Sequence, residues 1–293
     1  YDWDTRCSIV KTEEGWKEEN WKKFAELGLL GVPFEEDHGG LGGEATDIMI
    51  VMEQFGKGLV VEPYMPSIIL AGGLISKLGS ADQKNSIIPE IISGDSRYVF
   101  AYAEPQSRFD LFDVKCSATL DGDNYTINGF KSVVFGAGMA THLIISARTE
   151  GDQRSKSGIS LFLVDIKSEG ITLQNYPTID EYRASEVVIE NLTVSKENIL
   201  GKLGNSYEAI EEQVDLSTIA ICSEAVGILQ VLKDSTNDYC KNRKQFGQPI
   251  SANQAIQHRL VDMMIEYEQA KSILYMAITA DLSNPDERRK AAS

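Results

Sequence analysis

The chain has 293 residues, of which 25% are charged and 42% hydrophobic, an ordinary composition for a globular protein with two or three domains. Its 28 Lys and Arg residues against 44 Asp and Glu residues give a formal net charge of −16, which excludes nucleic acid as a general partner. No apolar run approaches the roughly 18 residues that a membrane span needs, so we expect none.

The cysteines and histidines are too scattered for a metal centre. The four cysteines show no C-x-x-C spacing, and the three histidines form no H-E-x-x-H motif. We therefore expect no metal. Without a secretory signal or a disulfide-like pattern, the composition favours a reducing, cytoplasmic location.

Residues 1–95 are predicted to form an N-terminal helical domain. Apolar side chains recur at steps of three and four in the segments 16–30, 45–56, 66–78 and 81–93. The glycine-rich stretch 35–43 follows no strand, so it is interpreted as a turn and not as a dinucleotide-binding loop. Tyr1 is no initiator, and residues 287–293 are typical of the opening turns of a helix. We expect a fragment truncated at both ends, without the first helix of this domain.

Residues 96–200 are predicted to form an antiparallel β-barrel or sandwich. From Arg97 onward, short runs rich in β-branched and aromatic residues alternate with turn signals such as Asp121-Gly122 and Glu169-Gly170. Asn128-Gly129 lies between two such runs, a strong signal for a β-hairpin.

Residues 201–293 return to the helical period and are predicted to form an incomplete C-terminal helical domain. Two amphipathic helices are separated by the link 243–250, which makes them an antiparallel αα-hairpin. In the link, Arg243 offers a planar fork of donors suited to phosphate or carboxylate, and Phe246 offers an aromatic face. A plainer interpretation is a basic helix end that complements its own dipole, with Phe246 tucked into the hairpin.

The link and its surroundings resemble a signature of the acyl-CoA dehydrogenase family. The signature is Tyr239-x-x-x-Arg243-Lys-Gln-Phe-Gly-Gln-Pro-Ile, followed by Gln254-Ala-Ile-Gln. Further segments follow in the family's order: Trp21–Pro33, Ala103–Pro105, Ile127–Lys131, Ile144–Arg148 and Asp215–Gly227. The α+β order of helices, barrel and helices is also the family's. Within it, the chain is most similar to the small subunit of pimeloyl-CoA dehydrogenase-like enzymes.

This resemblance implies a chemistry and a set of site residues. Family members oxidise an acyl-CoA thioester to the α,β-enoyl-CoA: a glutamate removes the α-proton, FAD takes the β-hydride, and electrons pass to an electron-transferring flavoprotein. The resemblance assigns Arg243, Gln245, Phe246 and Gln254 to FAD binding across a subunit interface, and Phe135 to the flavin ring pocket. Arg108 is a candidate partner for a carboxylate on the substrate.

The chain departs from the family pattern at positions expected to carry the catalytic base and to face the flavin. After Asp215-Leu216, Ser217 and Thr218 stand where the family has its glutamate base and an arginine. The family's other position for the base lies beyond residue 293, so the catalytic residue is unknown. Arg108-Phe109 replaces Gly-Ser in the flavin-side loop, and Val133-Val134-Phe135 replaces Trp-Ile-Thr/Ser.

Three hypotheses follow. In the first, the chain is the non-catalytic subunit of a hetero-oligomer and contributes interface residues to a flavin held mainly by a paralogous chain. In the second, it is a homo-oligomeric dehydrogenase whose base lies beyond residue 293. In the third, it is a structural or CoA-ester-binding subunit without catalysis.

Overall fold

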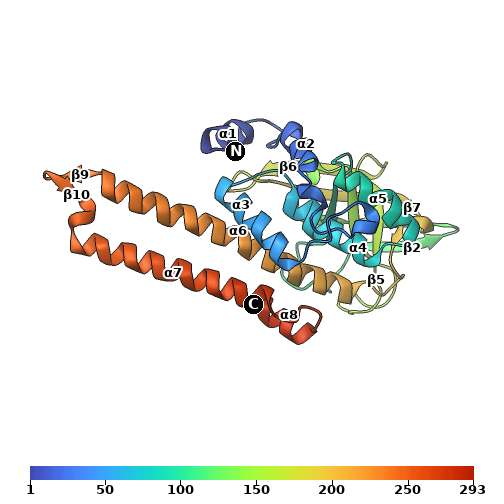
Figure 1. The fold of residues 1–293 in the computed structure, drawn as a ribbon. Coiled ribbons are helices and arrows are strands. Elements are labelled where there is room, and N and C mark those ends of the chain that lie inside the picture. The colour runs from blue at the N-terminus through green and yellow to red at the C-terminus, as the bar shows by residue number, and fades with distance from the viewer. The chain divides into compact units, whose positions relative to one another are not determined.

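The computed structural model describes all residues 1–293, which divide into two compact units (Figure 1). The sheet unit comprises residues 4–44 and 61–217, and the hairpin unit comprises residues 1–3, 45–60 and 218–293. Each unit is described by itself.

The helices of the sheet unit correspond closely to the apolar spacing of the sequence. They are α1 (Trp3–Val10, from Asp4 on), α2 (Glu18–Glu26), η1 (Leu29–Gly31), η2 (Glu36–His38), η3 (Tyr64–Gly72), α4 (Gly73–Leu78) and α5 (Ala81–Ile92). α1 was not predicted, and two other segments differ from the prediction. The segment 16–30 divides into an α-helix and a 3₁₀ turn, and the segment 66–78 begins as a π-helix and continues as α4. Ser80 and Gln83 close a capping box at the start of α5.

The sheet has eight strands and is mixed in direction. The strands are β1 (Tyr98–Ala101), β2 (Ser117–Asp121), β3 (Asn124–Phe135), β4 (His142–Arg148), β5 (Ile159–Asp165), β6 (Ile171–Pro177), β7 (Arg183–Ser195) and β8 (Ile199–Leu200). Their order is β6-β7-β3-β2-β4-β5-β8, and β1 pairs with β4. Most pairs are antiparallel, as predicted, but β1 and β2 pair with β4 in parallel. The end strands β6 and β8 do not pair with each other, so closure into a barrel is not confirmed.

The predicted hairpin turn at Asn128-Gly129 is wrong. β3 runs through both residues, and only a register shift against β7 marks the place. The turn between β2 and β3 lies instead at Gly122, whose φ is +59°. Gly129 is required for another reason, because a Cβ there would lie 2.6 Å from both the Cβ and the Sγ of Cys116. Asn-Gly can therefore occur within a strand, where another part of the chain passes close to the glycine, as well as in a turn.

This assignment predicts different costs for two alanine substitutions. Gly129→Ala should lower the free energy of unfolding by about 2–3 kcal/mol, because the new methyl group overlaps Cys116. Gly122→Ala should cost only about 1–2 kcal/mol from its left-handed backbone, since nothing lies within 4 Å of the added Cβ. Urea denaturation of both variants measures the difference, and equal costs would contradict the strand assignment.

The hairpin unit is built on two long antiparallel helices, confirming the predicted αα-hairpin (Figure 1). α6 (Tyr207–Asn242) belongs to this unit from Thr218 on and is followed by α7 (Gln254–Ile278) and α8 (Pro285–Ala292). α3 (Ala45–Gly58) crosses α6 at two glycines: a Cβ on Gly56 or Gly227 would lie 2.0 Å from a carbonyl oxygen of the other helix. The core consists of Met49, Ile219, Val226, Tyr267, Leu274 and Ile278.

One helix, α6, is long and apolar enough to cross a membrane, with a mean hydropathy of 1.5 over its most apolar stretch. This differs from the expectation that no segment is apolar enough to span a membrane. Core helices of folded domains pass the same test, and the buried Ile219 and Val226 of α6 contribute to the core described above. The observation is weak evidence for a membrane span.

Candidate functional site

The link between α6 and α7 forms a small β-hairpin, here called the tip. β9 (Lys244–Gln245) pairs with β10 (Gln248–Pro249), and Phe246 and Gly247 form the turn with φ values of +52° and +82°. A two-residue turn with both central φ values positive suits glycine, whereas a phenylalanine is strained there. The Phe246 ring is fully exposed, so the interpretation that tucked it into the hairpin is wrong.

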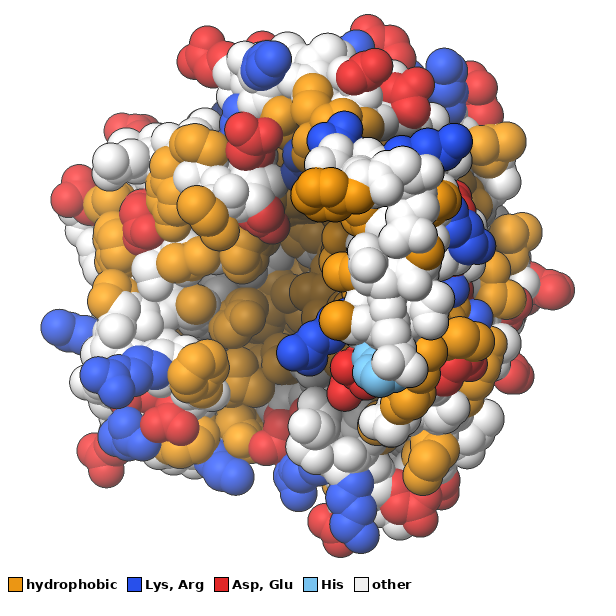
Figure 2. Space-filling model, turned by 90° about the vertical axis from the view of Figure 1, so that its left-hand side faces the viewer, with side chains coloured by type: hydrophobic (Ala, Val, Ile, Leu, Met, Phe, Trp, Pro, Cys, Tyr) orange, Lys and Arg blue, Asp and Glu red, His pale blue; other side chains and the backbone are white.

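The other predicted residues of the link also face solvent. Arg243, Lys244 and Gln245 are exposed, as is Gln254 at the start of α7. The Ile250 amide donates to the Arg243 carbonyl oxygen at 2.9 Å and closes the base of the tip. The structure thus brings Arg243, Gln245 and Phe246 together on one short hairpin. Figure 2 shows apolar, basic and acidic side chains exposed together in this view.

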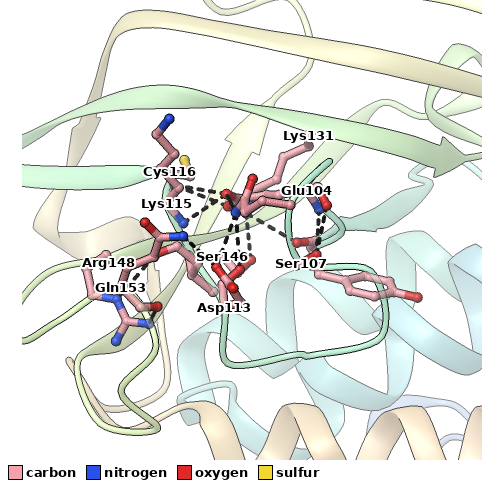
Figure 3. A network of polar contacts seen from close by, with 12 residues as sticks. Glu104, Ser107, Asp113, Lys115, Cys116, Lys131, Ser146, Arg148 and Gln153 are labelled. Carbon is pink, nitrogen blue, oxygen red and sulfur yellow. Dashed lines mark hydrogen bonds and ion pairs between the residues drawn. The ribbon is translucent and has the colours of Figure 1, made fainter.

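In the sheet unit, the segment that follows β1 is held by a buried ion pair (Figure 3). The Lys131 Nζ, on β3, donates to the Glu104 Oε1 at 2.7 Å and to the Ser146 Oγ at 3.0 Å, and Lys131 is completely buried. Glu104 also accepts from the backbone amides of Lys115 and Cys116. One carboxylate therefore joins β3 to both ends of the loop 105–114.

The protonation of these groups follows from their burial and charge. Burial by itself raises the pKa of the Glu104 carboxyl, but the charge and hydrogen bond of Lys131, with further donors, hold that pKa below its ordinary value. Burial raises the pKa of the adjacent Cys116 thiol to about 11. The acid is thus ionised and the thiol neutral near pH 7, as expected of a structural network and not of a reactive cysteine.

A second buried acid holds the far end of the same loop. Asp113 accepts from Gln153 and Arg154, both at 2.7 Å, and Arg154 also bonds to Asp110. The hydrogen bond from Gln153 is the main reason that the pKa of Asp113 is lowered. Arg148 donates to five backbone carbonyl oxygens, those of Phe112, Val114, Gln153, Ser155 and Ser157. The loop is therefore held on both sides.

Four of the residues that depart from the family pattern project outward from this framework: Arg108, Phe109, Val133 and Phe135. Arg108 has a φ of +50°, and the neighbouring Phe109 is 96% exposed. On β3, Val133 has a φ of +51°, and both Val133 and Phe135 are almost half exposed. The Phe135 ring contacts Tyr182 edge to face at 6.1 Å between centroids. The candidates Arg108 and Phe135 thus lie on separate segments of the sheet unit.

The position expected for a catalytic base holds no carboxylate. Ser217 is 4% exposed, and its Oγ has no hydrogen-bond partner. A buried hydroxyl can donate or accept a hydrogen bond but cannot remove a weakly acidic α-proton. The sequence predicts no role for Glu104 and Lys131. Both lie in or beside strand-forming runs, where a buried Glu or Lys needs a partner of opposite charge.

The ion pair should make stability depend on pH. Because the pKa of Glu104 is lower in the folded chain than its ordinary value of 4.5, its contribution is complete above that pH and is lost as the pH falls toward the folded value. The stability difference between the wild type and Glu104→Gln should therefore shrink below pH 4.5, by up to about 1.4 kcal/mol per pH unit. Urea denaturation from pH 7 downward measures it; a constant difference would contradict the lowered pKa.

Comparisons with known proteins cover almost the whole chain. Residues 5–95, 99–192 and 207–293 match the N-terminal, middle and C-terminal domains of acyl-CoA dehydrogenase. The probable acyl-CoA dehydrogenase YngJ of Bacillus subtilis is 33% identical, over 88% of this chain and 70% of the relative. The caffeyl-CoA reductase-Etf complex subunit CarC of Acetobacterium woodii is 31% identical, over 92% of this chain and 72% of that one.

A solved variant of the Tcur3481-Tcur3483 steroid ACAD is 28% identical, with a TM-score of 0.84 over 99% of this chain and 75% of that one. The matches agree with the helical ends and the sheet middle seen in the structure. The chain belongs to the acyl-CoA dehydrogenase family of FAD-dependent oxidoreductases.

Proposed function

We propose that the chain is the non-catalytic subunit of a hetero-oligomeric acyl-CoA dehydrogenase. In this role it extends the tip toward an FAD that is held mainly by a paralogous catalytic chain. The observation that carries the proposal is Phe246, fully exposed in a strained backbone conformation next to Arg243. Strain and an exposed aromatic ring persist where a binding partner uses them.

The tip has the chemistry that FAD requires. The guanidinium of Arg243 can bind a pyrophosphate oxygen pair through two parallel hydrogen bonds, and the Phe246 ring can stack on a planar heterocycle. The amides of Gln245 and Gln254 can donate to or accept from ring heteroatoms. When bound, FAD supplies the acceptor for the hydride from the substrate's β-carbon.

The chain's own sheet is less suited to hold the flavin alone. Val133 and Phe135 stand where the family carries an indole and a hydroxyl, and Phe135 adds a bulky ring against Tyr182. In the loop after β1, Arg108 and Phe109 replace two small residues. The changes on β3 remove an indole N–H and a hydroxyl, and Arg108, Phe109 and Phe135 add volume, so we expect weak flavin binding by the isolated chain.

The catalytic base is then assigned to the partner chain. Ser217 cannot supply it, and the partner's glutamate would remove the α-proton. The acyl-CoA substrate, the paralogous subunit and an electron-transferring flavoprotein are the partners that we propose. Arg108, exposed on its held loop, would pair with a carboxylate or phosphate of the substrate. All four cysteines are free, which supports the cytoplasmic location that we propose.

Two features support this assignment over the alternatives. A homo-oligomeric enzyme with its base beyond residue 293 would still need the sheet to hold its flavin, against the changes at Val133 and Phe135. A purely structural subunit would gain nothing from a strained, exposed Phe246. In addition, the name of the similar solved structure, Tcur3481-Tcur3483 steroid ACAD, joins two protein names and includes a steroid. Both agree with a paired arrangement and with a bulky acyl group.

Flavin stoichiometry tests the proposal directly. The chain purified alone should carry little FAD, and the chain co-purified with its paralogous partner should carry about one FAD per two chains, because each site uses residues from both. Absorption spectra with FAD counted per chain give the numbers. One tightly bound FAD per isolated chain, with turnover, would instead establish the homo-oligomeric enzyme.

Replacing Phe246 should change the stability of the chain and its contribution to FAD binding in opposite directions. Phe246→Gly removes the left-handed strain and should raise the free energy of unfolding by up to about 1 kcal/mol. The same change removes the stacking surface and should weaken FAD binding by the mixed complex about tenfold. Tyr275→Ala, which removes another exposed aromatic ring of the hairpin unit, is the matched control. Unchanged FAD affinity in Phe246→Gly would rule out the tip as a flavin contact.

A further inference from the structure

α7 is apolar on two opposite faces. On one face, Tyr267, Leu274 and Ile278 are buried in the core that α7 shares with α3 and α6. On the other face, five large apolar side chains are 48–73% exposed and form what is here called the stripe: Val261, Met264, Ile265, Ile273 and Met276. At about 3.6 residues per turn, the centre of the stripe lies roughly 150° around the helix axis from the core-facing residues. A helix that is apolar on both faces is normally covered on both.

The stripe forms one continuous, shallow surface. A groove of about 550 Å³ runs along it, and every residue of its lining belongs to α7. Glu268, Gln269 and Ser272 are the polar residues of this lining, and Glu268 is its only charged one. Single apolar side chains are common on protein surfaces, but a contiguous apolar face with few charges marks a site of interaction with another protein.

The polar centre of the stripe restricts what can cover it. Glu268 and Gln269 lie at its midpoint, and both are exposed. A second α7, laid antiparallel and centred between these residues, places Glu268 of each copy opposite Gln269 of the other. Each amide can then donate to a carboxylate, and the two ends of the stripe, Val261 and Met276, cover each other. A parallel pair in the same register would set the two Glu268 carboxylates against each other, which is unfavourable.

We infer that the stripe is the surface on which two copies of this chain associate, through antiparallel α7 helices. The two-fold axis passes between Glu268 and Gln269, and each copy presents the same patch to the other, as an isologous interface requires. Association removes the apolar side chains of both stripes from water, which supplies its driving force. The inference goes beyond the proposed function, because it needs neither FAD nor a paralogous chain.

Exchanging the two central residues tests whether this face meets a copy of itself. Gln269→Glu sets carboxylate against carboxylate across the axis, so the dissociation constant of the dimer should rise about tenfold or more. Adding Glu268→Gln to the same chain places an amide opposite each carboxylate again and should return the constant to within about threefold of the wild type. Sedimentation equilibrium of the purified full chain measures all three constants.

A charge placed in the apolar part of the stripe is the second test. Met264→Glu should leave the chain monomeric at concentrations where the wild type is dimeric, because the new carboxylate would be buried without a partner. Ile50→Glu is the control, since Ile50 is a similarly exposed apolar residue on α3 of the same unit, and this variant should remain dimeric. Both replaced side chains are half exposed, so both variants should fold, which circular dichroism checks.

Four results would overturn the inference. They are a monomeric wild-type chain, a dimer that Met264→Glu leaves intact, a dissociation constant that Gln269→Glu does not raise, and a raised constant that the added Glu268→Gln does not restore. In the last case the face would meet a different surface. A chain that is monomeric alone and associates only with a paralogous chain would assign the stripe to that partner. None of these measurements depends on FAD, so the proposed function stands or fails separately, by its flavin stoichiometry.

Discussion

The buried pair of Lys131 and Glu104 is the constraint on which the sheet unit's outward surface depends. Removing two charges from water is costly unless each finds its partner and its remaining hydrogen bonds. Here the cost is offset because one carboxylate accepts from an ammonium, a side-chain amide and two backbone amides. These partners come from β3 and from both sides of one loop, so none of the segments can shift without leaving a charge unpaired.

Strained backbone occurs at several exposed residues of both units. Arg108, Val133 and Phe246 all have positive φ values, although none is a glycine. Two of them lie next to the framework of Glu104 and Lys131, and the third forms the turn of the tip. A stability-driven sequence would place glycine at such positions, as it does at Gly122 and Gly247. Under the proposed function, contacts of these side chains with a partner or ligand would offset that strain.

The family relationship and the departures from it both agree with the proposed subunit role. The hairpin tip keeps its basic and aromatic groups, and the internal ion pair that shapes the sheet is complete. Residues expected to face a flavin from this chain's own sheet differ from the family pattern, and Ser217 stands at one of the two positions that the family uses for its base. This combination agrees with the proposed role of a subunit that supports a partner's chemistry.

By itself, the sequence determined the order of helices, sheet and helices, and it indicated the αα-hairpin and the Arg243 signature, because helical periodicity and a contiguous motif are local properties. Only tertiary structure decided that Asn128-Gly129 lies within a strand, since the close contact at Gly129 comes from Cys116, directly before the neighbouring strand β2. It also decided that Phe246 faces solvent and that Glu104 meets Lys131 across 27 residues of sequence. Contacts between segments far apart in the sequence produce no periodic pattern of residues, so those contacts could not be predicted from the sequence alone.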